Sequence, residues 1–328
     1  MIRPPDVIHP DTTIGAVHLT VADLGRSIAF YEEKLGFLTR GREAGVARLD
    51  AGGADLLVLH ESPSGPRARG ATGLYHFALL VPSRFDLARS LARFVETGTP
   101  LQGLSDHLVS EAVYLADPDG NGIEIYRDRP REEWVFDSGS LRMASLPLDP
   151  ASLLSETEGR GTDGERLSPG TMIGHVHLCV SDVAAAEGFY VDVLGFERTV
   201  RYGAGASFVS AGGYHPHIGF NTWTSACAGP PPPGAIGLRY FVVRLPGEAE
   251  SGTGSSSGSR PRVWSSRRRR TARSSAIHRA TPCCCRGARG ERRSRPPAGQ
   301  APARSAMRPN RSSICLRPVP IRKLGFRP

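Results

Sequence analysis

Hydrophobic and polar residues alternate in short stretches near the start of the chain, with one helical pattern among them. Residues 14–21 (IGAVHLTV) have the alternation of a half-buried strand. After Asp23, a favourable N-cap, apolar residues recur at helical spacing as far as Leu35, and Gly36 follows as a C-cap, so we predict a helix there. Further strands are predicted at residues 38–42, 47–50 and 55–60. These elements form one βαβββ unit.

A second unit of the same kind follows. It has a predicted strand at residues 74–81, a helix at 86–97 and three strands, of which the last two lie at 112–116 and 123–126. Between these two strands stands DPDGNG, and each of its residues favours a turn, so we predict that they form a hairpin. The order βαβββ is therefore repeated.

The repetition continues in the second half of the chain. Residues 173–196 match residues 14–37 without a gap, which indicates a third unit. Residues 237–246 (GLRYFVVRLP) match residues 73–82 (GLYHFALLVP), which indicates the start of a fourth. The pattern predicts an α+β protein built from tandem βαβββ modules.

The fourth unit does not finish. After Pro246 there is no strand alternation, no helical stripe and no second DPDGNG, and the low apolar content with high charge predicts disorder. A basic arm that binds nucleic acid is one interpretation, but we favour a frame change in the coding sequence, because the break falls inside a module. We divide the chain into a metal-bearing domain at 1–130 (modules at about 14–60 and 73–127), a linker at 131–169, a truncated second domain at 170–246 and a tail at 247–328.

The tail also dominates the charge of the chain. The 328 residues carry a formal net charge of +9, but residues 247–328 hold 20 basic and 3 acidic residues, and the remainder holds 21 basic and 29 acidic ones. The main part is therefore acidic. No stretch has the length and apolarity of a signal peptide or membrane span, and only Cys179 and Cys227 of the six cysteines precede the tail, so we expect a cytoplasmic protein without disulfides.

The predicted hairpin carries an unusual carboxylate. Glu124 lies in the strand between Ile123 and Ile125, and it shares a face with Tyr126 because side chains two apart point the same way. A carboxylate on such a strand needs a partner or a metal, since an unpaired buried charge is costly. We therefore expect Glu124 to face a cation, and Tyr126 could orient that carboxylate from behind.

Two histidines occupy comparable strands. His18 lies on the first strand of the first unit and His76 on the first strand of the second, and each alone is more often a core histidine than a ligand. If the first two units pack around a common cavity, His18, His76 and Glu124 can all face it. Two histidines and one carboxylate with open positions suit non-haem Fe(II) and oxygen chemistry, and Mn(II) could occupy the same site.

The segment around the hairpin resembles a known signature. It consists of His107, five residues, Val113 and Tyr114, then Asp117, Pro118, Gly120 and Glu124. On these residues, positions 1–246 resemble the vicinal oxygen chelate superfamily (glyoxalase, bleomycin resistance and dioxygenase proteins), and within it the two-domain extradiol dioxygenases of the catechol 2,3-dioxygenase type and their hydroquinone-cleaving relatives. The resemblance implies modules that form open, incomplete β-barrels.

The resemblance also implies roles for individual residues. His18, His76 and Glu124 fall at the positions of the iron ligands, His60 at that of the acid/base histidine, and His107 and Tyr114 at those of residues near the substrate. Each role has a structural alternative: His60 could be an exposed strand end, His107 a turn residue, and Tyr114 a core aromatic bonded to a backbone carbonyl. The implied reactants are a catechol or related dihydroxy aromatic and O₂.

The second half departs from this pattern. His177 matches His18, but Tyr240 stands where His76 would, and the strand that matches Glu124 is absent. We therefore expect no equal iron site there. The remaining histidines could form a vestigial or different metal site, or could be satisfied in a core or interface; they are His175, His177, His215 and His217.

The prediction from sequence is an Fe(II)-dependent extradiol dioxygenase that cleaves a small aromatic ring. Rival functions on the same fold are a metal-dependent glyoxalase-like lyase, isomerase or thiol transferase, and a resistance-type protein that binds an aromatic ligand without catalysis. We expect a homo-oligomer, no membrane partner and no nucleic-acid partner. The loss of the last half-module leaves open whether this chain is active, and it would expose an unpaired sheet edge.

Overall fold

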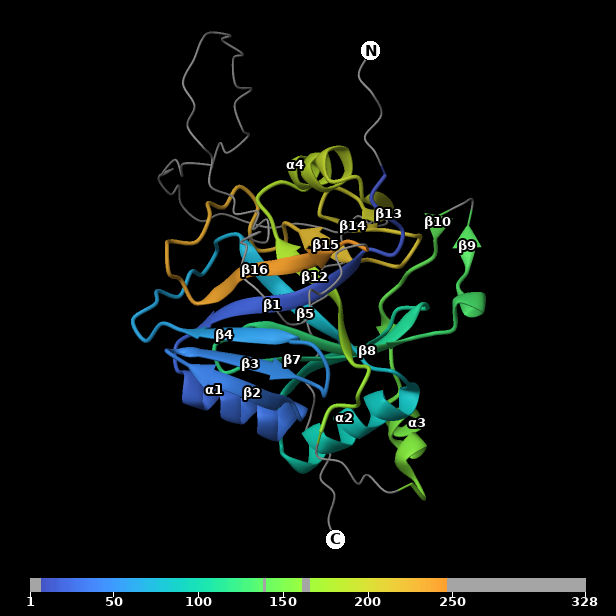
Figure 1. The fold of residues 1–328 in the computed structure, drawn as a ribbon. Coiled ribbons are helices and arrows are strands. Elements are labelled where there is room, and N and C mark those ends of the chain that lie inside the picture. The colour runs from blue at the N-terminus through green and yellow to red at the C-terminus, as the bar shows by residue number, and fades with distance from the viewer. Residues whose placement is uncertain (1–6, 138–139, 161–165, 247–328) are drawn as a thin grey trace, which may run out of the picture. The chain divides into compact units, whose positions relative to one another are not determined.

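The computed structural model describes residues 7–137, 140–160 and 166–246 (Figure 1). The predicted disordered tail at 247–328, including the three adjacent cysteines, lies outside the described residues. None of the helices within the described part has the length and apolar character needed to cross a membrane.

The first module has the predicted order of elements. Asp23 caps its helix by accepting a hydrogen bond from the Arg26 amide, and Gly36 ends it in the left-handed conformation with φ 84°. The second turn of this helix has π geometry. The elements are β1 (Thr13–Val21), α1 (Leu24–Phe30), η1 (Tyr31–Leu35), β2 (Leu38–Glu43), β3 (Val46–Asp50) and β4 (Leu57–Glu61).

The second module repeats this order. Its helix begins after Ser83, whose hydroxyl accepts from the Asp86 amide, and its last two strands form the predicted hairpin. The elements are β5 (Gly73–Leu80), α2 (Arg84–Glu96), β6 (Leu101–Asp106), β7 (Ser110–Ala116) and β8 (Gly122–Asp128).

The described part of the linker holds short elements, and the third module follows it. The linker elements are η2 (Arg131–Glu133), β9 (Phe136–Asp137), β10 (Ser140–Leu141), β11 (Leu146–Pro147), α3 (Pro150–Leu154) and η3 (Ser155–Thr157). The third module contains β12 (Met172–Cys179), α4 (Val183–Glu187), η4 (Gly188–Val193), β13 (Glu197–Tyr202), β14 (Ala206–Ser210) and β15 (Ile218–Asn221), and β16 (Gly237–Arg244) begins the fourth.

The modules combine into two sheets in an order that the sequence interpretation did not anticipate. One sheet has the strand order β16-β1-β4-β3-β2, and the larger one has the order β11-β6-β7-β8-β5-β12-β15-β14-β13. Figure 1 shows β16 (orange) beside β1 (blue). The first module thus shares a sheet with the fourth, and the second with the third, because β1 pairs with β16 and β5 pairs with β12. The first and second modules do not share a sheet, and the predicted boundary near residue 130 does not separate the sheets.

Alternate residues on each strand divide between an apolar core and a polar face. On β1, Val17 and Leu19 are fully buried in the main hydrophobic cluster, which also contains Leu57 and Leu59 of the parallel strand β4. Helix residues such as Tyr31 join the same cluster. The intervening residues on these strands include histidines, so the period of two that builds the core also places the candidate chemistry on the opposite face.

The DPDGNG turn is tied to the first module by buried carboxylates. Asp117 accepts hydrogen bonds from the backbone amides of Asp119 and Asn121 and from the Tyr31 hydroxyl, at 2.9, 2.8 and 3.0 Å. Asp119 lies 2.8 Å from the Arg67 guanidinium. The hairpin that carries Glu124 is therefore fixed at its tip.

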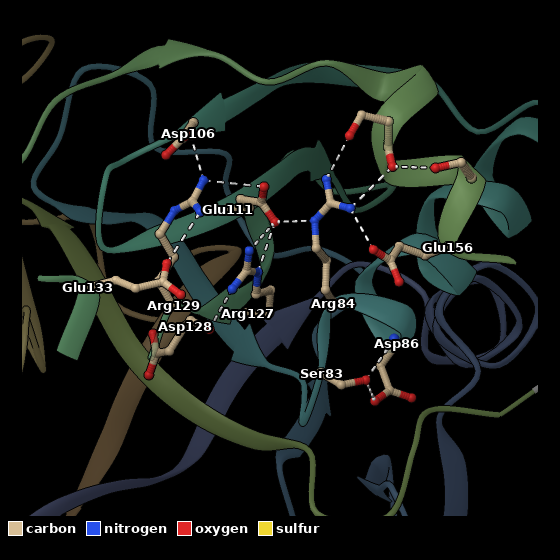
Figure 2. Close-up of polar contacts among 12 residues, drawn as sticks. Ser83, Arg84, Asp86, Asp106, Glu111, Arg127, Asp128, Arg129, Glu133 and Glu156 are labelled. Carbon is tan, nitrogen blue, oxygen red and sulfur yellow. Dashed lines mark hydrogen bonds and ion pairs between the residues drawn. The ribbon is translucent and has the colours of Figure 1, made fainter. Parts of the chain in front are cut away.

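A buried ionic network fixes the other end of the hairpin (Figure 2). Glu111 on β7 is 3% exposed and lies 2.9 Å from Arg84 at the start of α2 and 2.8 Å from Arg127 on β8. Arg129 completes the group at 3.4 Å. Arg84 also lies 2.8 Å from Glu156 in the linker, so one carboxylate and its guanidinium partners join the sheet, the helix and the linker.

Candidate metal centre

Three neighbouring strands bring three ligand-type side chains to one face of the larger sheet. His76 lies on β5, which pairs with β8 on one side and with β12 on the other. Ala78 of β5 is the register partner of both Glu124 on β8 and His175 on β12. Because His76 is two residues from Ala78, it points to the same face, and the small alanine leaves room between the larger side chains.

The ligand atoms of these residues form a compact triangle. The Nε2 atom of His76 lies 3.0 Å from Glu124 Oε2, His175 Nε2 lies 3.1 Å from the same oxygen, and the two Nε2 atoms are 3.3 Å apart. Adjacent ligands about 2.1 Å from an octahedral ion are about 3.0 Å apart, so the donor types and spacing fit a divalent metal such as Fe(II). Within the described residues this is the one group of its kind found.

Burial and the two imidazoles oppose each other in setting the charge of this group. Burial raises the pKa of Glu124, but the attraction and hydrogen bonds of His175 and His76 outweigh it and hold that pKa well below its usual range. Burial lowers the pKa of His76, which favours the neutral ring that a metal requires. Glu124 is therefore ionised and 2% exposed.

The predicted residues His107 and Tyr114 lie beside this group. His107 Nδ1 lies 2.7 Å from the Ala144 carbonyl oxygen, which can only accept, so Nδ1 carries a proton. His107 Nε2 is 2.7 Å from the Tyr114 hydroxyl, and Tyr114 is the cross-strand partner of Glu124. Burial, the Glu124 charge and a hydrogen bond to Glu124 raise the pKa of Tyr114 well above its usual value. The single phenolic proton thus has two possible acceptors, His107 Nε2 and the Glu124 carboxylate.

A further histidine with its own partner was not singled out from the sequence as part of this centre. His177 is the register partner of His76, and the two ring centroids are 5.0 Å apart. Asn221 Nδ2 lies 3.0 Å from His177 Nε2 and can only donate, so the His177 ring carries its proton on Nδ1. Burial lowers the pKa of His177 well below its usual range, which keeps the ring neutral.

Two residues that the sequence placed near iron lie elsewhere. His18 is on β1 in the smaller sheet, where its Nδ1 atom is 3.1 Å from His60 Nε2 and its ring stacks on Tyr240. The structure therefore brings together His76 and Glu124 as predicted, but it places His175, and not His18, with them. His60 is likewise absent from this group. The physical reason is the strand pairing, because β1 joins β16 while β12 joins β5.

Tyr126 supports the strand that carries His175. Its hydroxyl lies 2.7 Å from that of Tyr214, which donates to Asp128 at 2.9 Å, and Asp128 also contacts His215. Its ring centroid is 5.0 Å from that of His175. The Tyr126 hydroxyl thus bonds to Tyr214, and the Tyr126 ring packs against His175.

Gly174 makes room for Tyr126. A Cβ atom at this position would lie 1.8 Å from the Tyr126 hydroxyl oxygen, far inside contact distance. We expect Gly174→Ala to displace Tyr126 and lower the free energy of unfolding by about 1–3 kcal/mol, because adding an atom to a packed interior forces strain. Chemical denaturation checks this value. Gly174→Ala in a Tyr126→Phe background should recover part of the loss, and an unchanged midpoint in the single variant would contradict the close contact.

Buried His217 makes stability depend on pH. Burial, with smaller effects of His175 and His215, lowers its pKa from 6.5 to about 4, while its Nδ1 accepts from the Ala211 amide. The unfolded chain therefore binds a proton between pH 6.5 and 4 that the folded chain does not, so stability falls as pH falls through this window, by up to about 3 kcal/mol. In metal-free protein, His217→Asn should flatten the slope of unfolding free energy against pH, whereas the exposed control His9→Asn should not; equal slopes in wild type and His217→Asn would contradict this.

Several known proteins are similar to this chain. The catechol-2,3-dioxygenase of Bacillus subtilis (strain 168) is 47% identical over 249 residues, which cover 74% of this chain and 86% of that protein. Among solved structures, glyoxalase I from Zea mays covers 66% of this chain and 69% of its own at 16% identity and a TM-score of 0.41. A glyoxalase/bleomycin resistance protein/dioxygenase from Alicyclobacillus acidocaldarius covers 40% of this chain and 98% of its own at 23% identity and a TM-score of 0.31.

A family match covers both halves of the described chain. Residues 13–125 and 172–246 match the Glyoxalase/Bleomycin resistance protein/Dioxygenase superfamily, which is more than half of the sequence. The α+β class and the vicinal oxygen chelate fold expected from the repeated modules are thereby confirmed. The chain belongs to this superfamily, and within it the chain resembles the extradiol dioxygenases.

Proposed function

We propose that this chain is an Fe(II)-dependent extradiol dioxygenase that cleaves the ring of a catechol or a related small dihydroxy aromatic with O₂. The buried group of two histidines and one carboxylate carries the proposal. Its three donors leave other coordination positions of a bound ion open. The relative that is 47% identical is named for catechol cleavage, which supports the same substrate class for this chain.

The proposed ligands are His76, Glu124 and His175, with Fe(II) as the metal and Mn(II) as the alternative. When bound, such an ion would hold two substrate oxygens and O₂ together and act as a Lewis acid and electron conduit. The ionised Glu124 carboxylate supplies a negative charge among the three ligands, which favours a divalent cation. The sheet holds the three side chains in place, because each lies on a strand that is hydrogen-bonded to its neighbour.

Proton handling is assigned to Tyr114 and His107. A catechol must lose a hydroxyl proton to bind as an anion, and His107 can take a proton on Nε2 because Nδ1 already donates to Ala144. The Tyr114 hydroxyl lies between that nitrogen and the ligand carboxylate, so it can hydrogen-bond an oxygen placed beside Glu124. His60 is not assigned to this reaction, because it lies in the smaller sheet and its ring is hydrogen-bonded to His18 there.

Oxygen uptake tests this function. Full-length protein reconstituted anaerobically with Fe(II) should consume O₂ when catechol or hydroquinone is added, and the ring-opened product should absorb visible light. A glyoxalase-like activity would instead need no O₂ and would complete a four-ligand site, whereas the group found in the described residues has three members. Turnover of a thiol adduct without O₂ uptake would overturn the proposal in favour of that rival. A homo-oligomer and a cytoplasmic location remain predictions.

A further inference from the structure

A cavity lies against the smaller sheet, and the strands that hold the proposed metal ligands do not line it. Its volume is about 680 Å³, and it is lined by residues of all five strands of that sheet and of the loop between β3 and β4. Its polar lining includes His18, Arg40, Arg48, Asp55 and Arg244. His76, Glu124 and His175 are not among the lining residues.

The lining carries an excess of positive charge. Arg40 is paired with Asp50 at 2.6 Å and Arg48 with Asp55 at 2.6 Å. Arg244 lies at the end of β16 and its side chain is exposed. It has no ion-pair partner among residues 7–137, 140–160 and 166–246. An unpaired guanidinium in a concave surface is ready to bind an anion, because its planar fork matches two carboxylate oxygens.

The floor of the cavity offers a neutral imidazole. Burial, then His60 and Arg48, lower the pKa of His18 to about 4, and the positive charge of Arg239 acts in the same direction. If His60 donates through Nε2 to His18 Nδ1, the second nitrogen of His18 keeps a proton that it can donate. Two histidines this close could suggest a metal site, but the surrounding guanidinium groups oppose a cation.

We propose that this cavity binds a small organic carboxylate. Arg244 neutralises the carboxylate, Arg48 donates to it through guanidinium N–H groups other than the one that contacts Asp55, and His18 contacts it from β1. The site is separate from the proposed metal centre, so it does not depend on ring cleavage.

Calorimetric titration of the metal-free full chain with benzoate tests the site. We expect saturable binding that is unchanged when Fe(II) is added, and no detectable binding of the neutral analogue benzamide. Arg244→Gln and, independently, Arg48→Gln should each weaken benzoate binding by at least about tenfold, because each removes a charge-assisted contact. Arg198→Gln, an exposed arginine of the larger sheet, should bind as the wild type does.

Several results would overturn the proposal. One is no benzoate binding by the wild type, and another is an Arg244→Gln variant that binds as well as the wild type. Saturable binding of inorganic phosphate, together with no benzoate binding, would assign the cavity to a phosphate and reject the carboxylate. Thermal unfolding of each variant shows whether it is folded, and the Arg48→Gln result keeps the test decisive if Arg244→Gln does not fold.

Discussion

Replacement of Glu124 by glutamine is expected to remove bound metal and to lower the rate of oxygen uptake at least about a thousandfold. Glutamine keeps the volume of the side chain but loses the negative charge that the bound ion requires. A loss of about 4 kcal/mol in transition-state stabilisation corresponds to a factor of about a thousand. The Glu124 Oε2 atom lies 3.0 Å from His76 Nε2 and 3.1 Å from His175 Nε2. Glu124 is the one carboxylate of this group, so no second carboxylate of the group can replace it.

The control for this variant is Glu197→Gln, which removes one exposed carboxylate from β13. Both proteins are loaded with Fe(II) under the same anaerobic conditions, desalted and analysed for iron. The control should retain one equivalent of iron and its activity. Iron content in Glu124→Gln equal to that of the control would show that Glu124 is not a ligand.

Replacement of Glu111 by glutamine is expected to lower the free energy of unfolding by about 3–5 kcal/mol. The change leaves three guanidinium groups close together with their shared carboxylate removed, and loss of one partner from a buried ion pair has effects of this size. These groups belong to Arg84, Arg127 and Arg129, and Figure 2 shows them around the Glu111 carboxylate. Urea unfolding of metal-free protein measures the change.

The matched control for Glu111 is Glu133, which lies 3.7 Å from Arg129 and has a side chain that is 53% exposed. Glu133→Gln should change the free energy of unfolding by less than about 1 kcal/mol, because water screens an exposed pair. Equal effects of the two substitutions would mean that burial does not set the strength of this network.

Local sequence signals were sufficient to predict the modules. Asp23 caps the start of a helical segment and Gly36 caps its end, as the sequence pattern predicts. The DPDGNG turn connects two strands, also as predicted. These features depend on residues within one turn or one hairpin. The class of fold followed from their repetition.

The pairing of modules was not predictable from the same signals. Each module begins with a similar strand, so β1 could join β5 or β16 without any change in local pattern. The choice depends on contacts between segments more than 200 residues apart in the case of β1 and β16, and no turn chemistry specifies it. The first and second modules therefore lie in different sheets, and the strand of His18 is not beside the strands of His76 and Glu124.

The group in the structure contains His175 in place of the predicted His18 for a related reason. The sequence comparison aligned His18 with His177, but the stretch HFALLV that begins at His76 aligns better with HVHLCV, which begins at His175. In the first module the same position is Ala16. A comparison anchored on the leucine and valine of each strand would have identified His175, and it would have excluded the first module from the metal centre.

The match between His18 and His177 also accounts for the position of His60. His60 faces His18 in the smaller sheet, and Asn221 faces His177 in the larger one, at corresponding distances of 3.1 and 3.0 Å. His60, to which the resemblance implied an acid/base role, thus lies in the smaller sheet, whereas Glu124 lies in the larger one. Tyr114 and His107 lie beside the group of His76, Glu124 and His175, because Tyr114 is on the same hairpin as Glu124 and contacts His107.

Iron stoichiometry of two histidine variants tests the central claim most directly. His175→Ala and His18→Ala are each loaded anaerobically with Fe(II), desalted and analysed for bound iron beside the wild type. The structure predicts that His175→Ala loses its iron and that His18→Ala retains one equivalent, because His175 and not His18 lies with His76 and Glu124. Iron lost from His18→Ala and retained by His175→Ala would contradict the account.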